Sequence, residues 1–100
     1  MSVKGLDMVQ FGPADFSLSS GLIGQSGPEN SRKVKEAEQY VIETALKMGI
    51  APRAEISNPE QAKRYLDMGV RHFCMGTDVS ILRSWFQEQG EEMAKVLLNF

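Results

Sequence analysis

Residues 52–76 contain one strand–helix–strand unit and read PRAEISNPEQAKRYLDMGVRHFCMG. We expect a strand over residues 52–56 with Pro52 at its first position, because proline lacks the N–H group that an inner position would use. Asn58 and Pro59 then predict a helix start, since asparagine caps helices and proline fits the first helical position. Gln61 is placed to bond back to that cap. One short segment therefore predicts a strand and the helix that follows it.

Similar signals for the start and end of helices recur along the rest of the chain. The apolar residues of an earlier stretch recur every three or four positions, which predicts an amphipathic helix. These residues are Val34, Ala37, Val41, Ala45 and Met48. Asn30 or Ser31 can cap this helix, and Gly49 follows where a left-handed residue is expected. A loop rich in glycine and serine, residues 16–28, precedes it. In full, we expect strands at 6–11, 52–56 and 71–75 and helices at 31–48, 59–68 and 78–98.

Three successive strand–helix units predict an α/β fold with parallel strands, because each helix supplies the crossover that a parallel pair requires. An α+β domain, with one segment wrongly read as a strand, is the alternative. Three parallel strands with helices on one side leave two open edges and one bare face, although parallel sheets are normally covered on both faces. We therefore interpret residues 1–100 as one partial domain of a larger sheet or barrel, or as a chain that completes itself by oligomerising.

Composition excludes several classes of protein. The chain has 100 residues, of which 42% are hydrophobic and 24% charged, and this balance is typical of a globular domain. Eleven basic against thirteen acidic residues give no electrostatic case for nucleic acid. No apolar stretch approaches the ~20 residues of a membrane span, and residues 1–8 lack the apolar core of a secretory signal. Cys74 is the single cysteine, which excludes an internal disulfide. We expect a cytoplasmic protein with neither nucleic-acid nor membrane partners.

The strongest candidate site is Gly12-Pro13-Ala14-Asp15, which follows the first strand. In parallel β/α folds the functional groups gather where strands end. A glycine lets the backbone approach a ligand, Ala14 offers a backbone N–H group, and Asp15 offers a carboxylate. Mg²⁺ and Mn²⁺ prefer such oxygen ligands. On the residues alone, an Asp15 that only caps its turn is the simpler interpretation.

Residues 12–17, with the glycine-containing sequel 18–21, resemble the Gly-Pro-Ala-Asp-Leu-Ser segment of the HpcH/HpaI family of class II, metal-dependent pyruvate aldolases. This family includes enzymes of the 2,4-dihydroxyhept-2-ene-1,7-dioic acid aldolase type. Phe16 stands where the family usually has leucine. Residues 69–73 are similar to the glycine and last strand of the family, and residues 76–82 are similar to its last strand-to-helix turn. The resemblance covers nearly the whole chain and concerns the C-terminal portion of the family.

The resemblance implies the last three units of a TIM (β/α)8 barrel, because such a barrel needs about 250 residues. It implies a carbon–carbon lyase that cleaves or forms 4-hydroxy-2-oxo acids, giving pyruvate and an aldehyde through a metal-bound enolate. Asp15 would be one of two carboxylate ligands of a divalent metal, Mg²⁺ or Mn²⁺, and Gly12 and Ala14 would bind the substrate. The resemblance further implies a homo-oligomer in which the last helix reaches a neighbouring subunit.

Three residues of the family have no matching position here: its second metal carboxylate, its catalytic histidine and its substrate-binding arginine. No catalytic residue is therefore assigned. His72 falls inside the last strand, and we interpret it as a wall or surface residue. Glu55, near the end of the second strand, is a conceivable second carboxylate, with plain surface exposure as the alternative. Cys74 lies in an apolar strand without a basic neighbour, which favours a packing role.

The last helix offers two further features. Thr77 and Asp78 place a helix N-terminus at a strand end, where barrels often hold an anion, and ordinary capping by Asp78 is the alternative. Trp85, Phe86 and the apolar tail 96–100 exceed what three units can bury. We expect these apolar residues to contact another subunit.

Two other functions stay open beside the aldolase. The chain can be a non-catalytic, truncated barrel fragment that self-associates or pairs with a partner chain, since the upstream glutamate, histidine and arginine are missing. A related lyase acting on acyl-CoA ranks third, because no residue indicates a CoA-binding groove. The identity of the aldehyde and of the metal is not encoded in these residues.

Overall fold

The computed structural model describes residues 1–21 and 27–100 and contains a three-stranded parallel sheet of order β1-β2-β3. The strands are β1 (Met8–Gln10), β2 (Ala51–Ile56) and β3 (His72–Met75). The helices are α1 (Pro13–Ser19), α2 (Pro28–Lys47), the 3-10 turn η1 (Pro59–Gln61), α3 (Ala62–Met68) and α4 (Asp78–Leu98). The expected α/β class with parallel strands is confirmed, and the α+β alternative is wrong.

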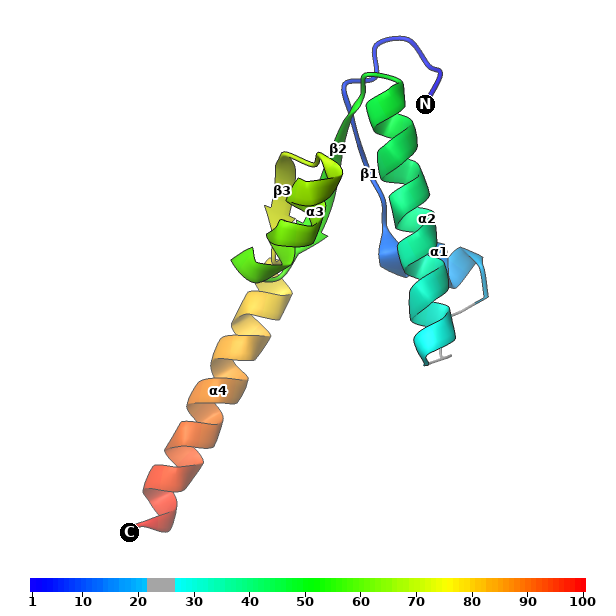
Figure 1. The fold of residues 1–100 in the computed structure, drawn as a ribbon. Coiled ribbons are helices and arrows are strands. Elements are labelled where there is room, and N and C mark those ends of the chain that lie inside the picture. The colour runs from blue at the N-terminus through cyan, green and yellow to red at the C-terminus, as the bar shows by residue number, and fades with distance from the viewer. Residues whose placement is uncertain (22–26) are drawn as a thin grey trace.

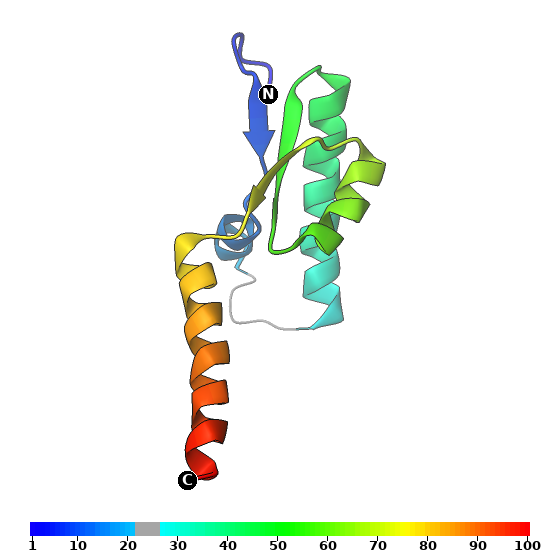
Figure 2. The same cartoon turned by 90° about the vertical axis from the view of Figure 1, so that its left-hand side faces the viewer.

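Helices α2 and α3 pack on one face of the sheet, as Figures 1 and 2 show. Side chains of β2 alternate accordingly: Pro52, Ala54 and Ile56 are buried, whereas the intervening residues are exposed. The core consists of Ile42, Ala54 and Val70, with Tyr65, Met68 and Phe73 packed against it. In the described part of the chain, the face of β2 that carries Arg53 and Glu55 stays open to solvent.

Strand β2 begins one residue earlier than expected, so Pro52 occupies its second position and not its first. The N–H of Ala51 donates to the carbonyl oxygen of Asp7 at 3.1 Å, on the side of β1. The next nitrogen along a strand faces the opposite neighbour, and pairing with β3 starts only where Arg53 meets His72. Pro52 is therefore tolerated because no strand partner needs its missing N–H group. The other two strands are shorter than the expected 6–11 and 71–75.

Helix α2 begins at Pro28, three residues before the expected start. Gly27 is its N-cap, so the expected caps Asn30 and Ser31 are wrong: proline at the first helical position starts the helix earlier. Gly49 follows with φ +71°, the left-handed conformation that its position predicts. Met48 lies beyond the last helical residue and is 46% exposed, so it leaves the expected apolar stripe.

The expected loop at residues 16–28 is wrong at its start, because α1 covers Pro13–Ser19; residues 22–26 lie outside the described part. The expected helix 59–68 is present as η1 followed by α3. Asn58 caps it as predicted, accepting from the Gln61 N–H at 3.2 Å. The Gln61 side chain accepts from the N–H of Ser57 at 2.6 Å, one residue before the cap to which it was expected to bond.

Helix α4 leaves the body of the molecule and extends into solvent (Figures 1 and 2). The chain measures 64 × 28 × 23 Å with a radius of gyration of 17.9 Å, whereas a compact chain of this length has about 13 Å. No residue of α4 is buried, and Trp85 is 56% exposed. No helix within the described residues combines the length and apolarity that crossing a membrane requires.

Candidate functional site

The turns that follow the three strands lie along one edge of the sheet, because the strands run parallel. β1 continues into Gly12, β2 into Ser57 and β3 into Gly76. The N–H of Gly76 donates to the carbonyl oxygen of Ile56 at 2.8 Å, which ties two of these turns together. This edge is where parallel β/α folds place their functional groups.

The Gly12–Asp15 turn is a rigid strand-to-helix connection. Gly12 is the N-cap of α1 and Pro13 is its first helical residue. The N–H of Phe16 donates to the carbonyl oxygen of Gly12 at 2.9 Å, and the hydroxyl of Ser17 donates to that of Pro13 at 2.8 Å. The ring of Phe16 also lies 5.4 Å from that of Phe11. These contacts hold the helix directly at the end of the strand.

The Asp15 carboxylate is exposed in the first turn of α1 and folds back over Gly12. A Cβ atom at Gly12 would lie 2.9 Å from Oδ2 of Asp15, so the glycine leaves room for this carboxylate. Within the described residues no hydrogen bond or ion pair occupies Asp15. Ala14 is exposed beside it, and N–H groups in the first turn of a helix have no intrahelical acceptor. An open carboxylate beside free backbone donors suits a cation that itself holds an anionic ligand.

Asp15 is not part of a larger cluster of ligands. In the ranges 1–21 and 27–100, no three histidine, cysteine, aspartate or glutamate side chains gather at one place. Glu55 is exposed and lines a cavity together with residues of α2 and α3. Within the described residues, Asp15 is therefore not joined by two further side chains of these types.

The start of α4 borders a cavity of about 300 Å³ at the same edge. Its lining residues are Ser57, Gly76, Ser80, Ile81 and Ser84. Thr77 is the N-cap in place of Asp78: its hydroxyl accepts from the Ser80 N–H at 3.1 Å. Asp78 accepts from the N–H of Val79 at 2.8 Å. Two N–H groups of the first turn already have acceptors, which supports capping over anion binding.

His72 and Cys74 both lie on β3, away from any catalytic arrangement. His72 is exposed, in agreement with a surface role. Cys74 is half-buried, and its Sγ lies 3.9 Å from the carbonyl oxygen of Gly76, which is a weak contact. Packing accounts for this cysteine.

The sequence patterns did not reveal a buried carboxylate on α2. Glu38 is only 7% exposed; it accepts from the hydroxyl of Tyr65 at 2.9 Å and from Nη1 of Arg64 at 3.3 Å. Burial, together with this hydrogen bond to a carboxylate, raises the pKa of Tyr65 above its ordinary value of 10.0. Glu38, Ile42 and Ala45 have the spacing of one helix face, and this signal places Glu38 toward the core.

The chain is similar to curated aldolases from several bacteria. It is 38% identical over 82 residues to a hydroxypyruvate/pyruvate aldolase of Delftia acidovorans. It is 34% identical over 82 residues to the 4-hydroxy-2-oxo-heptane-1,7-dioate aldolases of Escherichia coli and Shigella flexneri. These relatives confirm the resemblance to the HpcH/HpaI aldolases. Each match includes 82% of this chain, and no family model matches it.

The chain spans 29–30% of the length of these aldolases. The similarity therefore covers most of this chain but less than a third of each relative. A complete HpcH/HpaI aldolase contains further segments, and the structure described above agrees with one part of such an enzyme.

Proposed function

We propose that this chain supplies the last three units of a metal-dependent (β/α)8 aldolase. The reaction is the cleavage or formation of 4-hydroxy-2-oxo acids, with pyruvate and an aldehyde as the smaller partners. The observation that carries the proposal is the open Asp15 carboxylate over Gly12 at the C-terminal edge of a parallel sheet, in a chain related to named aldolases. A cytoplasmic location belongs to the same proposal.

Each residue of the Gly12–Asp15 turn has a defined role in this proposal. Asp15 would be one ligand of the divalent cation, and its hard carboxylate oxygens fit Mg²⁺ or Mn²⁺. The N–H of Ala14, with the close approach that Gly12 allows, would orient the carboxylate of the keto acid. A bound divalent cation would supply Lewis-acid stabilisation of the negative charge that develops when the carbon–carbon bond breaks.

The open parts of the molecule support an assembly larger than this chain. The face of β2 that carries Arg53 and Glu55 is uncovered, and parallel sheets are covered on both faces in complete folds. Trp85 and Phe86 on α4 are more than half exposed, although they form an edge-to-face pair at 5.2 Å. We include in the proposal that α4 contacts a neighbouring subunit of a homo-oligomer.

Binding of Mn²⁺ in the presence of pyruvate tests the role of Asp15. The titration compares the wild-type chain with Asp15→Ala and with Asp67→Ala, an exposed carboxylate on α3 that serves as the matched control. We expect the wild type and the control to bind alike and Asp15→Ala to bind at least about tenfold more weakly, because a metal ligand is lost.

Equal binding by all three proteins would contradict the assignment of Asp15. Absence of binding in all three would show that this chain alone holds only half of the metal site, whose function then belongs to a longer protein. If Asp15-dependent binding is found, carbon–carbon lyase activity in the assembled protein is the next measurement.

A further inference from the structure

The cavity of about 300 Å³ at the start of α4 is lined by hydroxyl groups and carries no charged side chain. Its lining residues come from the turn after β2, the turn after β3 and the first two turns of α4. They are Ser57, Gly76, Ser80, Ile81 and Ser84. This neutral cavity therefore lies at the same C-terminal edge of the sheet as the Gly12–Asp15 turn.

Two of the three hydroxyl groups in the neutral cavity are available to a ligand. The hydroxyl oxygen of Ser80 accepts from the N–H of Thr77 at 3.0 Å, and the hydroxyl donates to the carbonyl oxygen of Thr77 at 3.0 Å. Within the described residues, the hydroxyls of Ser57 and Ser84 make no hydrogen bond. Because a serine hydroxyl both donates and accepts, these two side chains can pair with hydroxyl groups of a ligand.

Gly76 and Ile81 add a small apolar surface to the neutral cavity. Ile81 is the only apolar side chain among the lining residues. A Cβ at Gly76, which has φ +73°, would lie 3.3 Å from the Ile81 side chain, so the glycine backbone and this side chain are close together. An apolar surface beside two free hydroxyls fits a short carbon chain that carries hydroxyl groups.

The turns that follow the three strands contain acidic residues but no lysine, arginine or histidine. These turns are residues 12–17, 57–60 and 76–80, and their carboxylates belong to Asp15, Glu60 and Asp78. Lys63 of α3 compensates one of them, since its Nζ lies 3.4 Å from Glu60. A carboxylate on a ligand would therefore gain no counter-charge from these turns, and placing it beside other carboxylates is unfavourable.

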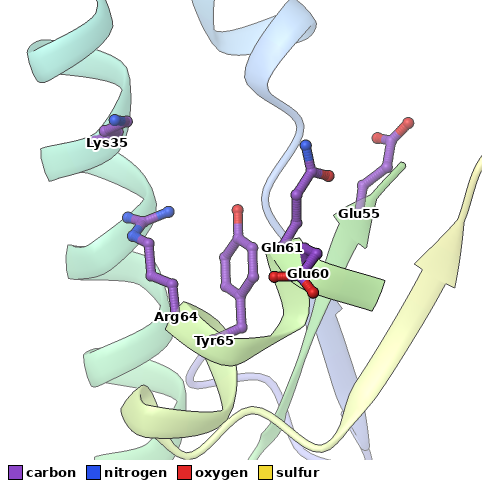
Figure 3. A pocket seen from close by; sticks show the side chains of 6 residues that line it. All are labelled: Lys35, Glu55, Glu60, Gln61, Arg64 and Tyr65. Atoms are coloured by element: carbon purple, nitrogen blue, oxygen red, sulfur yellow. The ribbon is translucent and has the colours of Figure 1, made fainter. Parts of the chain in front are cut away.

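The cations of α2 and α3 belong to a different cavity, of about 410 Å³. Figure 3 shows Lys35 on α2 and Arg64 on α3 among the side chains that line it. Arg64 is already engaged by the buried carboxylate of Glu38 at 3.3 Å. Neither cation lines the neutral cavity, so neither compensates an anion there.

We propose that the neutral cavity receives the aldehyde part of the substrate and selects a short, uncharged aldehyde that carries hydroxyl groups. This inference rests on the proposed aldolase function, in which the keto acid lies at the Gly12–Asp15 turn. Ser57 and Ser84 would bond to the hydroxyls of the aldehyde, and Ile81 would contact its carbon chain. An aldehyde without hydroxyls would gain nothing from the two serines, and an aldehyde with a carboxylate would face acidic residues without a free cation.

The rate of aldol addition to pyruvate, measured with Mn²⁺ in the assembled protein, tests this inference. Three aldehydes are compared: glyceraldehyde, propanal with the same carbon chain but no hydroxyls, and succinate semialdehyde with a carboxylate. We expect kcat/KM for glyceraldehyde to exceed each of the other two values at least about tenfold. An equal or higher kcat/KM for propanal or succinate semialdehyde overturns this inference alone. Absence of product with all three aldehydes overturns the proposed function, and this inference with it.

Substitutions in α4 locate the selectivity. Ser84→Ala should lower kcat/KM about tenfold for glyceraldehyde and leave it unchanged for propanal, because only the former bonds to the hydroxyl. Ser84→Lys should raise kcat/KM for succinate semialdehyde about tenfold by supplying a counter-charge. Gln89→Lys adds the same charge to the same helix outside the lining and should not raise it.

Both positions are exposed, and a circular dichroism spectrum of each variant confirms that it is folded. The inference is overturned if Ser84→Ala lowers kcat/KM equally for glyceraldehyde and propanal, or if Ser84→Lys and Gln89→Lys behave alike.

Discussion

Helices α2 and α4 have 20 and 21 residues, yet one is packed and the other is not. α2 buries Glu38, Ile42 and Ala45 against the sheet and α3. α4 buries nothing, although it carries large apolar side chains such as Trp85 and Phe86. Apolar periodicity thus predicts that a helix forms, but whether its apolar face is buried depends on a partner surface. For α4 that surface is absent from the described chain.

The two helices also differ in how their starts are fixed. Thr77 and Ser80 form a capping box at the start of α4, in which each side chain accepts from the other's backbone N–H. α2 starts at Gly27 and Pro28 with no side-chain cap. Local signals therefore define α4, whereas α2 depends more on packing against β2.

The largest expected difference between the helices is the effect of shortening an apolar side chain. Ile42→Ala should lower the free energy of unfolding by about 3 kcal/mol, because it leaves a cavity in the core. The matched change on α4, Leu82→Ala, shortens a side chain that is 57% exposed. It should change the free energy of unfolding by less than about 0.5 kcal/mol. Urea denaturation followed by circular dichroism, at concentrations where the chain is monomeric, measures both values. A large loss for Leu82→Ala in the monomer would show that α4 is packed after all.

Removing the polar contact that joins α2 to α3 should have a smaller effect on stability. Within the described residues, α4 makes no such contact with another helix. Tyr65→Phe removes the hydroxyl that donates to Glu38 and should lower the free energy of unfolding by about 1 kcal/mol, since the pair is only partly buried. The pKa of Tyr65 is raised in the folded chain, so this stabilisation is complete below pH 10.0 and is lost as the pH rises through the folded pKa.

Denaturation of the wild type and of Tyr65→Phe at pH 8 and at a series of pH values above 10.0 measures this contribution. The two unfolding free energies should differ at pH 8 and converge once the pH has passed the raised pKa of Tyr65 in the folded chain. A difference that stays the same while the Tyr65 hydroxyl is observed to ionise, by its ultraviolet absorbance, would show that the hydroxyl contributes nothing through its bond to Glu38.

The elements most accurately predicted from the sequence are those with strong local signals. The predicted helix 78–98 matches α4, and Asn58 caps its helix as expected, because capping depends on a few neighbouring residues. The start of β2 and the polar contact of Glu38 depend on segments distant in sequence. Pro52 is acceptable at the second position of its strand only because β3 pairs from Arg53 onward, which local patterns do not show.

The same distinction applies to the candidate sites. The Gly12–Asp15 turn is recognisable because its residues are consecutive, and it lies where the strand edge was expected. The contacts of Glu38 with Arg64 and Tyr65 join α2 to α3, which are distant in sequence, so no contiguous motif predicts them.

The smallest expected effect comes from a substitution inside α4, and it tests whether this helix is stabilised by its own sequence without packing contacts. Gly90 lies inside α4, and a Cβ there meets nothing within 4 Å. Gly90→Ala should therefore stabilise the helix by about 0.5 kcal/mol through its higher helix propensity, and helical circular dichroism on heating measures the change. Gly69→Ala is the control of opposite sign, since Gly69 has φ +98° and a Cβ there would lie 3.2 Å from Leu46. If Gly90→Ala instead weakens the folded chain, the surface around Gly90 is already in contact with another part of the assembly, and the contrast between α2 and α4 does not hold in solution.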